Sequence, residues 1–223
     1  MFLTAKHVAK RVQSPESEIV ILQDINLDIQ RGESVAILGA SGSGKTTLLT
    51  LLAGLDLPTS GDIHMEKNAI SSMNEEERAK VRAEYVGFIF QSFQLLPSLT
   101  ALENVMLPLE IQYVDYAIAK QRATDWLTKV GLGNRLHHSP VKLSGGEQQR
   151  VAIARAFITQ PKIIFADEVT GNLDEKTGHL VSDELFTLNK AFNTTLVLVT
   201  HDMTLASRCE KKYLLTEGKL HAW

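Results

Sequence analysis

A glycine-rich run near the start of the chain has the residue types and the spacing that binding of a polyphosphate requires. The pattern G-x-x-x-x-G-K-[ST] is matched by Gly39-Ala40-Ser41-Gly42-Ser43-Gly44-Lys45-Thr46, and Thr47 comes directly after it. Glycines let a loop bend tightly and bring backbone N–H groups close to phosphate oxygens, and a helix after the loop directs its positive end at them. Lys45 would supply a charge to the β- and γ-phosphates, and the hydroxyl of Thr46 is suited to ligate Mg²⁺. The run predicts a site for a nucleoside triphosphate with Mg²⁺.

Two adjacent carboxylates, Asp167 and Glu168, end the apolar stretch Ile163–Ala166. Ligands of open α/β sheets bind at the carboxyl ends of such strands. Asp167 is placed to hold Mg²⁺, commonly through its water shell, and Glu168 is the candidate to orient and deprotonate an attacking water. By themselves, two acids could simply end a strand before a turn. Together with the glycine-rich run they predict hydrolysis of the bound nucleotide.

A second candidate for anion binding is a helix start that carries two glycines. Ser144 at the N-cap and Glu147 three residues later form a capping box. Helix capping therefore explains these two residues without any role in binding. Capping does not explain Gly145 and Gly146, because glycine costs a helix about 1 kcal/mol relative to alanine. Uncovered N–H groups at a helix N-terminus are what an anion requires. The two glycines therefore predict a second phosphate-facing element.

The elements that must position these residues alternate along the chain. Ser34–Leu38 is a short apolar stretch, typical of a strand buried on both faces, and it leads into the glycine-rich run. The next expected element is a helix from about Gly44 to Ala53. Buried strands interleaved with helices indicate an α/β fold. The other expected strands are 2–8, 19–22, 25–29, 86–90, 162–166 and 194–200, and the other expected helices are 101–111, 115–130, 144–160 and 177–190.

Composition sets limits on the kind of protein. The chain has 223 residues, a formal net charge of −3 and a single cysteine, Cys209. The absence of a basic excess argues against a protein that mainly neutralises nucleic-acid phosphates, and one cysteine cannot form an intrachain disulfide. Neither the apolar core of a signal peptide nor an apolar run long enough to span a bilayer is present in the sequence. We therefore expect a cytoplasmic protein.

Three further motifs accompany the glycine-rich run, the paired carboxylates and the two-glycine helix start. They are Gln91, which ends the strand 86–90, Gly171-Asn172-Leu173-Asp174, and His201 after the strand 194–200. Each of them alone would be an ordinary polar loop. In this order and spacing, and with Ser144–Gln148 as the signature motif, they resemble the ATP-binding cassette (ABC) ATPases over essentially the whole chain. The stretches 87–91 and 95–105 are similar to the subgroup of lipoprotein-releasing, macrolide-export and cell-division cassettes.

The resemblance implies an α/β fold with a phosphate-loop NTPase (RecA-like) core, an N-terminal antiparallel β subdomain and an inserted α-helical subdomain. It implies one cassette over residues 1–223, with the core and β subdomain at about 1–91 and 144–223 and the helical subdomain at about 92–143. In this family two cassettes dimerise head to tail around two ATP molecules. The implied catalytic residues are Glu168, Gln91 and His201, and the implied Mg²⁺ ligands are Thr46, Gln91 and Asp167. ATP would also contact Ser144, Gly145, Gly146 and Asp174.

The resemblance also implies a partner, because cassettes of this subgroup drive a separate integral membrane permease. The contact surface would lie around Gln91–Thr100 and the helical insertion, which would hold the chain at the inner face of the cell membrane. The subgroup favours export, lipid or lipoprotein extraction, or mechanotransmission, with no nucleic acid as partner. The alternative is a soluble ABC ATPase acting on nucleic acid or the ribosome. Such proteins typically carry coiled coils, zinc modules or two cassettes, none of which this sequence shows.

Two positions depart from the family pattern. Val169 comes after the predicted catalytic glutamate where the family usually has proline, and proline would restrict Glu168 to extended backbone. Val12 stands where many members stack an aromatic ring on the adenine. We expect slower or differently regulated hydrolysis from the first change. From the second we expect weak discrimination between ATP and GTP.

Overall fold

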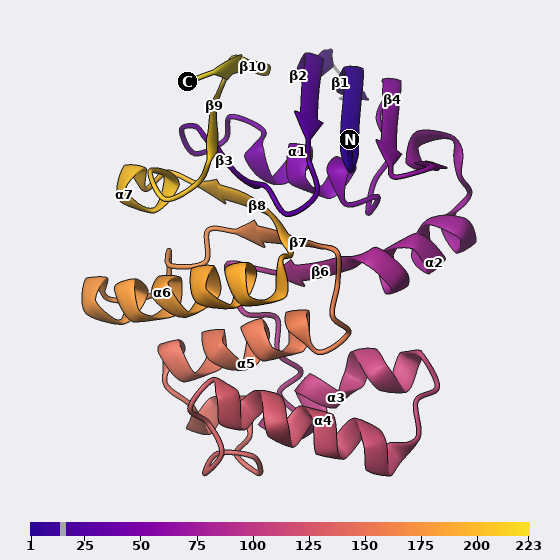
Figure 1. The fold of residues 1–223 in the computed structure, drawn as a ribbon. Helices are drawn as coiled ribbons and strands as arrows, with labels where there is room; N and C mark the ends of the chain where they lie inside the picture. The colour runs from indigo at the N-terminus through magenta and orange to yellow at the C-terminus, as the bar shows by residue number, and fades with distance from the viewer. Residues whose placement is uncertain (14–16) are drawn as a thin grey trace. The chain divides into compact units, whose positions relative to one another are not determined.

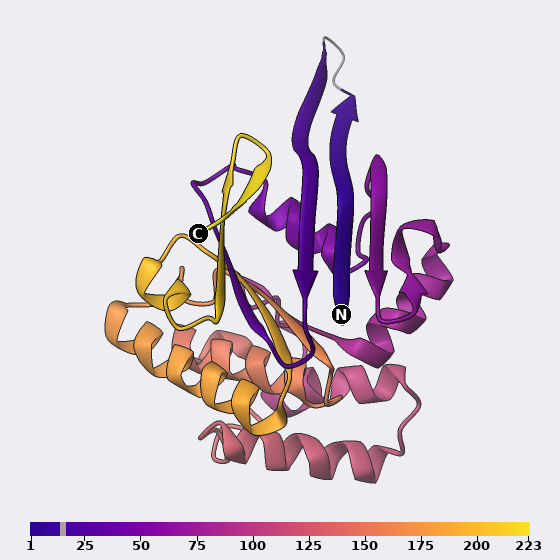
Figure 2. The ribbon, with the colours of Figure 1, turned by 45° about the horizontal axis from the view of Figure 1, so that its top comes forward.

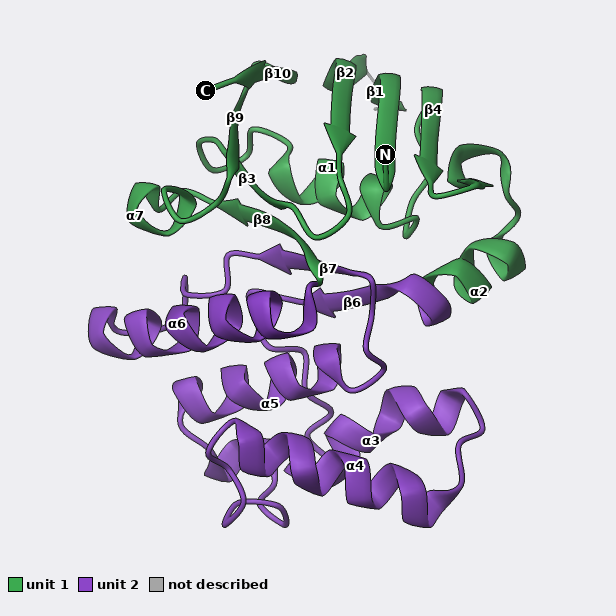
Figure 3. Cartoon of the chain, viewed as in Figure 1, with its two compact units in different colours: residues 1–82, 194–223 green, residues 83–193 purple. Residues whose placement is uncertain are grey.

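Short parallel strands precede the predicted site residues, and these strands belong to two compact units of the chain. The computed structural model describes residues 1–13 and 17–223. These form two units, residues 1–82 with 194–223 (unit 1) and residues 83–193 (unit 2), shown in different colours in Figure 3. Helix α2, Glu75–Tyr85, begins in unit 1 and ends in unit 2.

Unit 1 holds a long antiparallel hairpin and a short parallel sheet. The hairpin of β1 and β2 pairs with β4, which pairs in turn with β5, and the long strands run side by side in Figure 2. In the other sheet β3 lies between β8 and β9, parallel to both, and β10 pairs antiparallel with β9. The elements of unit 1 other than α2 are β1 Leu3–Gln13, β2 Glu18–Ile29, β3 Ser34–Leu38, α1 Lys45–Leu52, β4 Ser60–Met65, β5 Asn68–Ala69, the 3₁₀ turn η1 Ile70–Ser72, β8 Thr195–Thr200, α7 Met203–Ala206, β9 Lys211–Thr216 and β10 Lys219–Ala222.

The hairpin is longer than the hydrophobic pattern predicts. The pattern indicates a strand at 2–8 and two short strands at 19–22 and 25–29, whereas β1 reaches Gln13 and β2 is continuous from Glu18 to Ile29. The alternation breaks because the pairing contains register irregularities between Ala5 and Arg11. A β-bulge shifts which side chains face the core without ending the strand.

Unit 2 is mainly helical around two short parallel strands. Strands β6 and β7 pair in parallel, with α5 packed next to β6, and helices α6, α5 and α4 lie one after another in Figure 1. Trp126, Phe157 and Phe192 stack between these helices, with ring centroids 5.1 to 6.1 Å apart. The elements are β6 Val86–Ile89, α3 Ala101–Ile111, α4 Tyr116–Lys129, the 3₁₀ turn η2 Pro140–Lys142, α5 Gly145–Phe157, β7 Ile163–Asp167 and α6 Glu175–Phe192.

Helix ends differ from the expected ones for local reasons. Helix α5 ends at Phe157 rather than Gln160, because Gln160 has a positive φ of 52° and Pro161 comes next. Helix α6 begins at Glu175 rather than Thr177, because the Asp174 side chain caps it. Among the described residues, no helix is both long and apolar enough to cross a membrane.

Candidate functional site

The glycine-rich loop of unit 1 joins the buried strand β3 to helix α1. Gly44, the N-cap of α1, has φ 97°, a left-handed conformation that costs a residue with a Cβ free energy and costs glycine none. Lys45 begins the helix and is only 6% exposed, and its Nζ donates hydrogen bonds of 2.9 Å to the carbonyls of Gly39 and Ala40. The ammonium group is thereby folded back over the loop. An ammonium group and a glycine-containing turn at the start of a helix are groups suited to bind phosphate oxygens.

The donor groups of this loop fit a polyphosphate. The hydroxyl oxygen of Ser43 is buried and makes no hydrogen bond to any residue that the structure describes. A buried hydroxyl without a partner is costly, so a ligand oxygen at this place would stabilise it. Thr46 is exposed in the first turn of α1, where the helix dipole also favours an anion. Ser43, Lys45 and Thr46 thus present a hydroxyl, an ammonium and a second hydroxyl along one loop.

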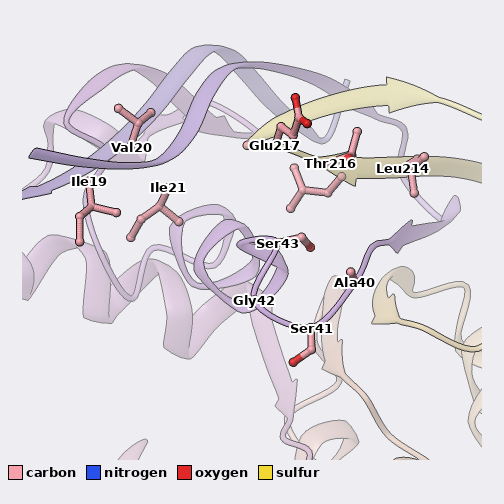
Figure 4. A pocket seen from close by; sticks show the side chains of 12 residues that line it. Ile19, Val20, Ile21, Ala40, Ser41, Gly42, Ser43, Leu214, Thr216 and Glu217 are labelled. Carbon is pink, nitrogen blue, oxygen red and sulfur yellow. The ribbon is translucent and has the colours of Figure 1, made fainter.

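A cavity of about 590 Å³ opens beside this loop (Figure 4). It is lined by three segments of unit 1: residues 19–21 of β2, residues 40–43 of the loop, and residues 214–218 of β9 and the turn after it. Its size is that of a small-molecule site, and its β2 wall is aliphatic. Val12, the predicted base contact, is not among the lining residues. It is 43% exposed and pairs across the hairpin with Ile19, which does line the cavity.

The cavity wall therefore includes residues that sequence reasoning missed. Ile19, Val20 and Glu217 belong to no motif, and only the pairing of β1 with β2 and the turn after β9 bring them to the loop. The one signal in the sequence is the apolar run of 19–22, which by itself indicates only a strand.

His201 lies at the same sheet edge as the glycine-rich loop. Strands β3 and β8 are parallel, and Leu38 is paired with Thr200, so that Gly39 and His201 are the next residues of neighbouring strands. The carboxyl ends of parallel strands meet at one edge. Asp202 comes next and caps α7 by accepting from Thr204 N and Leu205 N at 2.7 and 3.2 Å. The cap fixes the turn that carries His201.

In unit 2 the paired carboxylates and Gln91 follow the carboxyl ends of two paired strands. Ile89 of β6 is paired with Ala166 of β7, so both strands end at the same level. Asp167 closes β7 and is 8% exposed. Gln91 Nε2 and Glu168 Oε2 lie 3.1 and 3.4 Å from the point where a Cβ on Gly171 would stand. The predicted base and the glutamine therefore converge on one glycine.

The backbone at Glu168 departs from extended geometry. Its φ is 43°, in the left-handed region, and its carbonyl accepts a 2.9 Å hydrogen bond from Gly171 N. Val169, the next residue, is buried at 2% exposure. A proline at position 169 would push Glu168 towards extended backbone, so valine is compatible with the conformation found here.

The predicted capping box at the start of α5 is present. Ser144 Oγ accepts from Glu147 N at 3.3 Å, and Glu147 Oε2 accepts from Ser144 N at 2.8 Å. Arg135 Nε donates to the other Glu147 oxygen at 3.0 Å. The Ser144 backbone hydrogen bond is the main cause that lowers the pKa of the Glu147 carboxyl, and the Arg135 guanidinium is the next. The carboxylate at this helix start therefore stays ionised, and its charge is paired with the Arg135 guanidinium.

Gly146 also has a packing role, which the sequence did not indicate. A Cβ at this position would collide with the methyl group of Thr177 in α6. Glycine in the first turn of α5 thus allows α5 and α6 to approach closely, which is one reason for its presence there. Gly145 is less confined, since its nearest neighbour would be Leu173 Cδ2 at 3.2 Å.

Asp174 has a structural role in addition to the predicted one. Its carboxylate caps α6 by accepting from Thr177 N at 3.0 Å, and hydrogen bonding by Thr177 lowers the pKa of the Asp174 carboxyl. Each unit thus gathers its own share of the predicted residues. Unit 1 holds 39–47 and His201, and unit 2 holds Gln91, Asp167, Glu168, 144–146 and Asp174.

Comparison with known proteins places this arrangement in context. A protein-family model described as ABC transporter matches residues 22–171, more than half of the chain. The chain is 50% identical over 214 residues to the uncharacterized ABC transporter ATP-binding protein YbbA of Escherichia coli (strain K12), covering 96% of this chain and 94% of YbbA. It is 47% identical over 218 residues to the lipoprotein-releasing system ATP-binding protein LolD of Hydrogenovibrio crunogenus (strain DSM 25203 / XCL-2), covering 98% and 95%.

A solved structure shows the same fold. The chain matches the dimeric structure of a post-hydrolysis state of the ATP-binding cassette MJ0796 bound to ADP and Pi with a TM-score of 0.91 and 40% identity, over 98% of this chain and 96% of that one. The expected α/β fold, with an antiparallel β part and helical parts, is confirmed by this likeness. The likeness to lipoprotein-releasing cassettes that the motifs indicate is confirmed as well.

Proposed function

Because the chain belongs to the ABC transporter family, we propose that it hydrolyses ATP to drive a separate membrane permease, as one of two cassettes that close around two ATP molecules. The observation that carries this proposal is the phosphate-binding loop with Lys45 folded over it, in a chain that matches a cassette with bound ADP and Pi over nearly its whole length. The matched structure of MJ0796 is dimeric, which supports the arrangement of two cassettes as a pair.

The site residues have distinct roles in the reaction. The loop 39–47 binds the triphosphate through its N–H groups and Lys45. Glu168 accepts a proton from a water whose oxygen attacks the γ-phosphorus, the bond to the bridging oxygen breaks, and ADP and phosphate result. Gln91 and His201 contact the γ-phosphate side. Thr46, Gln91 and Asp167 are the residues that would hold Mg²⁺, which offsets charge on the β- and γ-oxygens when bound.

The second copy supplies what one chain lacks. Ser144, Gly145 and Gly146 form an anion-binding helix start that belongs to unit 2, whereas the glycine-rich loop belongs to unit 1. Two phosphate-facing elements in one chain are redundant within one site and complementary across a two-fold interface. We place each ATP between the loop of one chain and Ser144–Gly146, with Asp174, of the other. Hydrolysis would then let the dimer open.

The relatives indicate the kind of permease and substrate. LolD is named as part of a lipoprotein-releasing system, which supports export or extraction of a lipid-linked substrate, or mechanotransmission. The permease would bind residues 91–100 and the helical subdomain, for which we retain the boundaries 92–143. This binding would hold the chain at the inner face of the cell membrane.

Glu168→Gln tests the assignment of the catalytic base. We expect ATP binding to remain, phosphate release to fall close to background and an ATP-bound dimer to accumulate, which calorimetry, a phosphate assay and light scattering would measure. Phosphate release near the wild-type rate would overturn the role of Glu168.

The partner is tested by purifying the tagged chain from detergent-solubilised membranes. A membrane protein with its own transmembrane helices should co-purify in stoichiometric amount. Recovery of a nucleoprotein or of ribosomes instead would favour a soluble ABC ATPase and contradict the proposed function.

A further inference from the structure

The segment Gln91–Thr100 contains no helix or strand, and side chains of other elements hold its backbone. At its far end, the buried Asn104 of α3 accepts from Leu96 N at 2.8 Å and donates to Leu96 O and Thr100 O at 3.1 and 3.0 Å. In its middle, Arg155 of α5 donates to the carbonyls of Phe93 and Gln94 at 2.7 and 2.6 Å. These bonds replace the missing backbone ladder.

The middle of the segment needs such support because it is strained. Phe93 and Gln94 both have positive φ values, 60° and 46°. A left-handed conformation is unfavourable for a residue with a Cβ and persists only where the surroundings enforce it. A released segment would therefore relax to another backbone path.

A third hydrogen bond holds the end of the segment where the chemistry takes place. The side-chain amide of Asn172 donates to the backbone carbonyl of Gln91 at 2.8 Å, across 81 residues of sequence. Asn172 is exposed and so contributes little to the hydrophobic core. The residue before it, Gly171, donates from its N–H to the Glu168 carbonyl at 2.9 Å. One short turn thus bonds to the main chain of both Glu168 and Gln91.

We propose that Asn172 is a positioning residue that holds Gln91 beside Glu168, and that it links the turn 171–174 mechanically to the segment Gln91–Thr100. The inference rests on the proposed function, in which Gln91 ligates Mg²⁺ and the segment faces the permease. A movement of the turn 171–174 at the dimer interface would displace Gln91 through the Asn172 amide.

The chemistry of the bond supplies the test, because its donor is the Asn172 amide and its acceptor is a carbonyl. Asn172→Ala removes the donor, and Asn172→Asp keeps the size while setting a carboxylate against the carbonyl oxygen. We expect kcat for Mg²⁺-dependent ATP hydrolysis to fall about fivefold in Asn172→Ala and tenfold or more in Asn172→Asp, with the unfolding temperature nearly unchanged. If Asn172 only filled space, Asn172→Asp would have a kcat close to that of the wild type, because aspartate and asparagine have nearly the same size.

Two readouts are independent of turnover. Hydrogen–deuterium exchange at residues 92–94 should be faster in both variants, and the gain in ATP affinity on adding Mg²⁺, compared with EDTA, should shrink. Asn193→Asp, an exposed change of the same charge at the end of α6, is the matched control and should behave like the wild type. Exchange and Mg²⁺-dependent affinity equal to those of the control would overturn the inference. A wild type without ATPase activity would overturn the proposed function. The exchange rates at residues 92–94 would still show whether Asn172 holds the segment in place.

Discussion

At the scale of single residues, the predicted catalytic base has an unusual backbone conformation and an unusual neighbour. Glu168 is left-handed, and Val169 stands in the place of the usual proline. Valine leaves an N–H at position 169 and does not enforce extended backbone on Glu168. The hydrogen bond from Gly171 N to the Glu168 carbonyl, and not a proline ring, supports the backbone that carries this carboxylate.

We expect Val169→Pro to lower kcat for ATP hydrolysis a few-fold with little change in KM, because proline would push Glu168 out of the left-handed backbone that places the base here. Steady-state kinetics would measure it. Val169→Ala keeps the N–H and is the control for loss of buried volume, monitored by thermal unfolding. An equal or higher kcat in Val169→Pro would show that the left-handed backbone of Glu168 is not needed to place the base.

The aliphatic wall of the cavity beside the loop is a second residue-scale feature. Ile19 and Val20 line the cavity beside the loop, and Val12 lies across the hairpin from Ile19. Aliphatic side chains contact any base in much the same way, whereas an aromatic ring adds stacking worth about 0.5–1.5 kcal/mol.

We therefore expect the wild type to bind ATP and GTP with similar affinity. Val12→Tyr should tighten ATP binding about 2- to 10-fold, as the stacking free energy implies, and calorimetry with both nucleotides would measure it. Val12→Leu, which adds volume without a ring, is the control. A marked preference of the wild type for ATP would contradict the role given to the aliphatic wall.

At the scale of elements, the start of α5 has a capping box that stabilises the helix in addition to the binding role we propose for it. The Glu147 carboxylate is bonded by Ser144 N and by Arg135, and its pKa is lowered. A carboxyl whose pKa is lower in the folded chain stabilises the fold above its unfolded pKa of about 4.3. That contribution is lost as the pH falls through the lower, folded-state pKa.

Glu147→Ala should lower the free energy of unfolding by about 1 kcal/mol at pH 7, from the lost capping box and the lost partner of Arg135. The difference from the wild type should shrink below about pH 4, since the wild-type carboxyl is then increasingly protonated. Urea unfolding at pH 7 and in acid would measure both values. Glu147→Gln keeps the capping geometry without the charge, so a pH-independent difference between it and the wild type would contradict the electrostatic part.

At the scale of the whole molecule, the two phosphate-facing elements predict shared sites. Lys45→Ala should lose nucleotide affinity, and Ser144→Arg should block the helix start that faces the other chain. In a mixture of the two variants, the heterodimer has one site that contains both substitutions, because the altered loop of one chain faces the altered helix start of the other. Its second site contains neither substitution. Mixing the two inactive variants should restore part of the ATPase activity, at most about a quarter of the wild-type value under random pairing. No recovery on mixing, with both variants folded, would contradict the head-to-tail arrangement.

The sequence by itself determined the chemistry, because each motif acts through residues that are close in the chain. The glycine-rich run, the paired carboxylates and the Ser144 capping box are short-range patterns whose backbone geometry is set locally, and all three have the predicted local structure. Buried strands alternating with helices determined the α/β class equally well. The ends of elements were less predictable, because caps and bulges decide them.

Only the tertiary structure decided which distant residues support the site. The cavity wall joins residues 19–21 with 214–218, and Asn172 meets Gln91 across 81 residues. Contacts of this kind depend on strand register and helix packing, which leave no periodic trace in the sequence. Gly146 illustrates the same limit, since its closeness to Thr177 arises from the packing of α5 on α6 and not from the motif around it. Local chemistry is therefore determined by short-range sequence, and the positions of supporting residues by long-range packing.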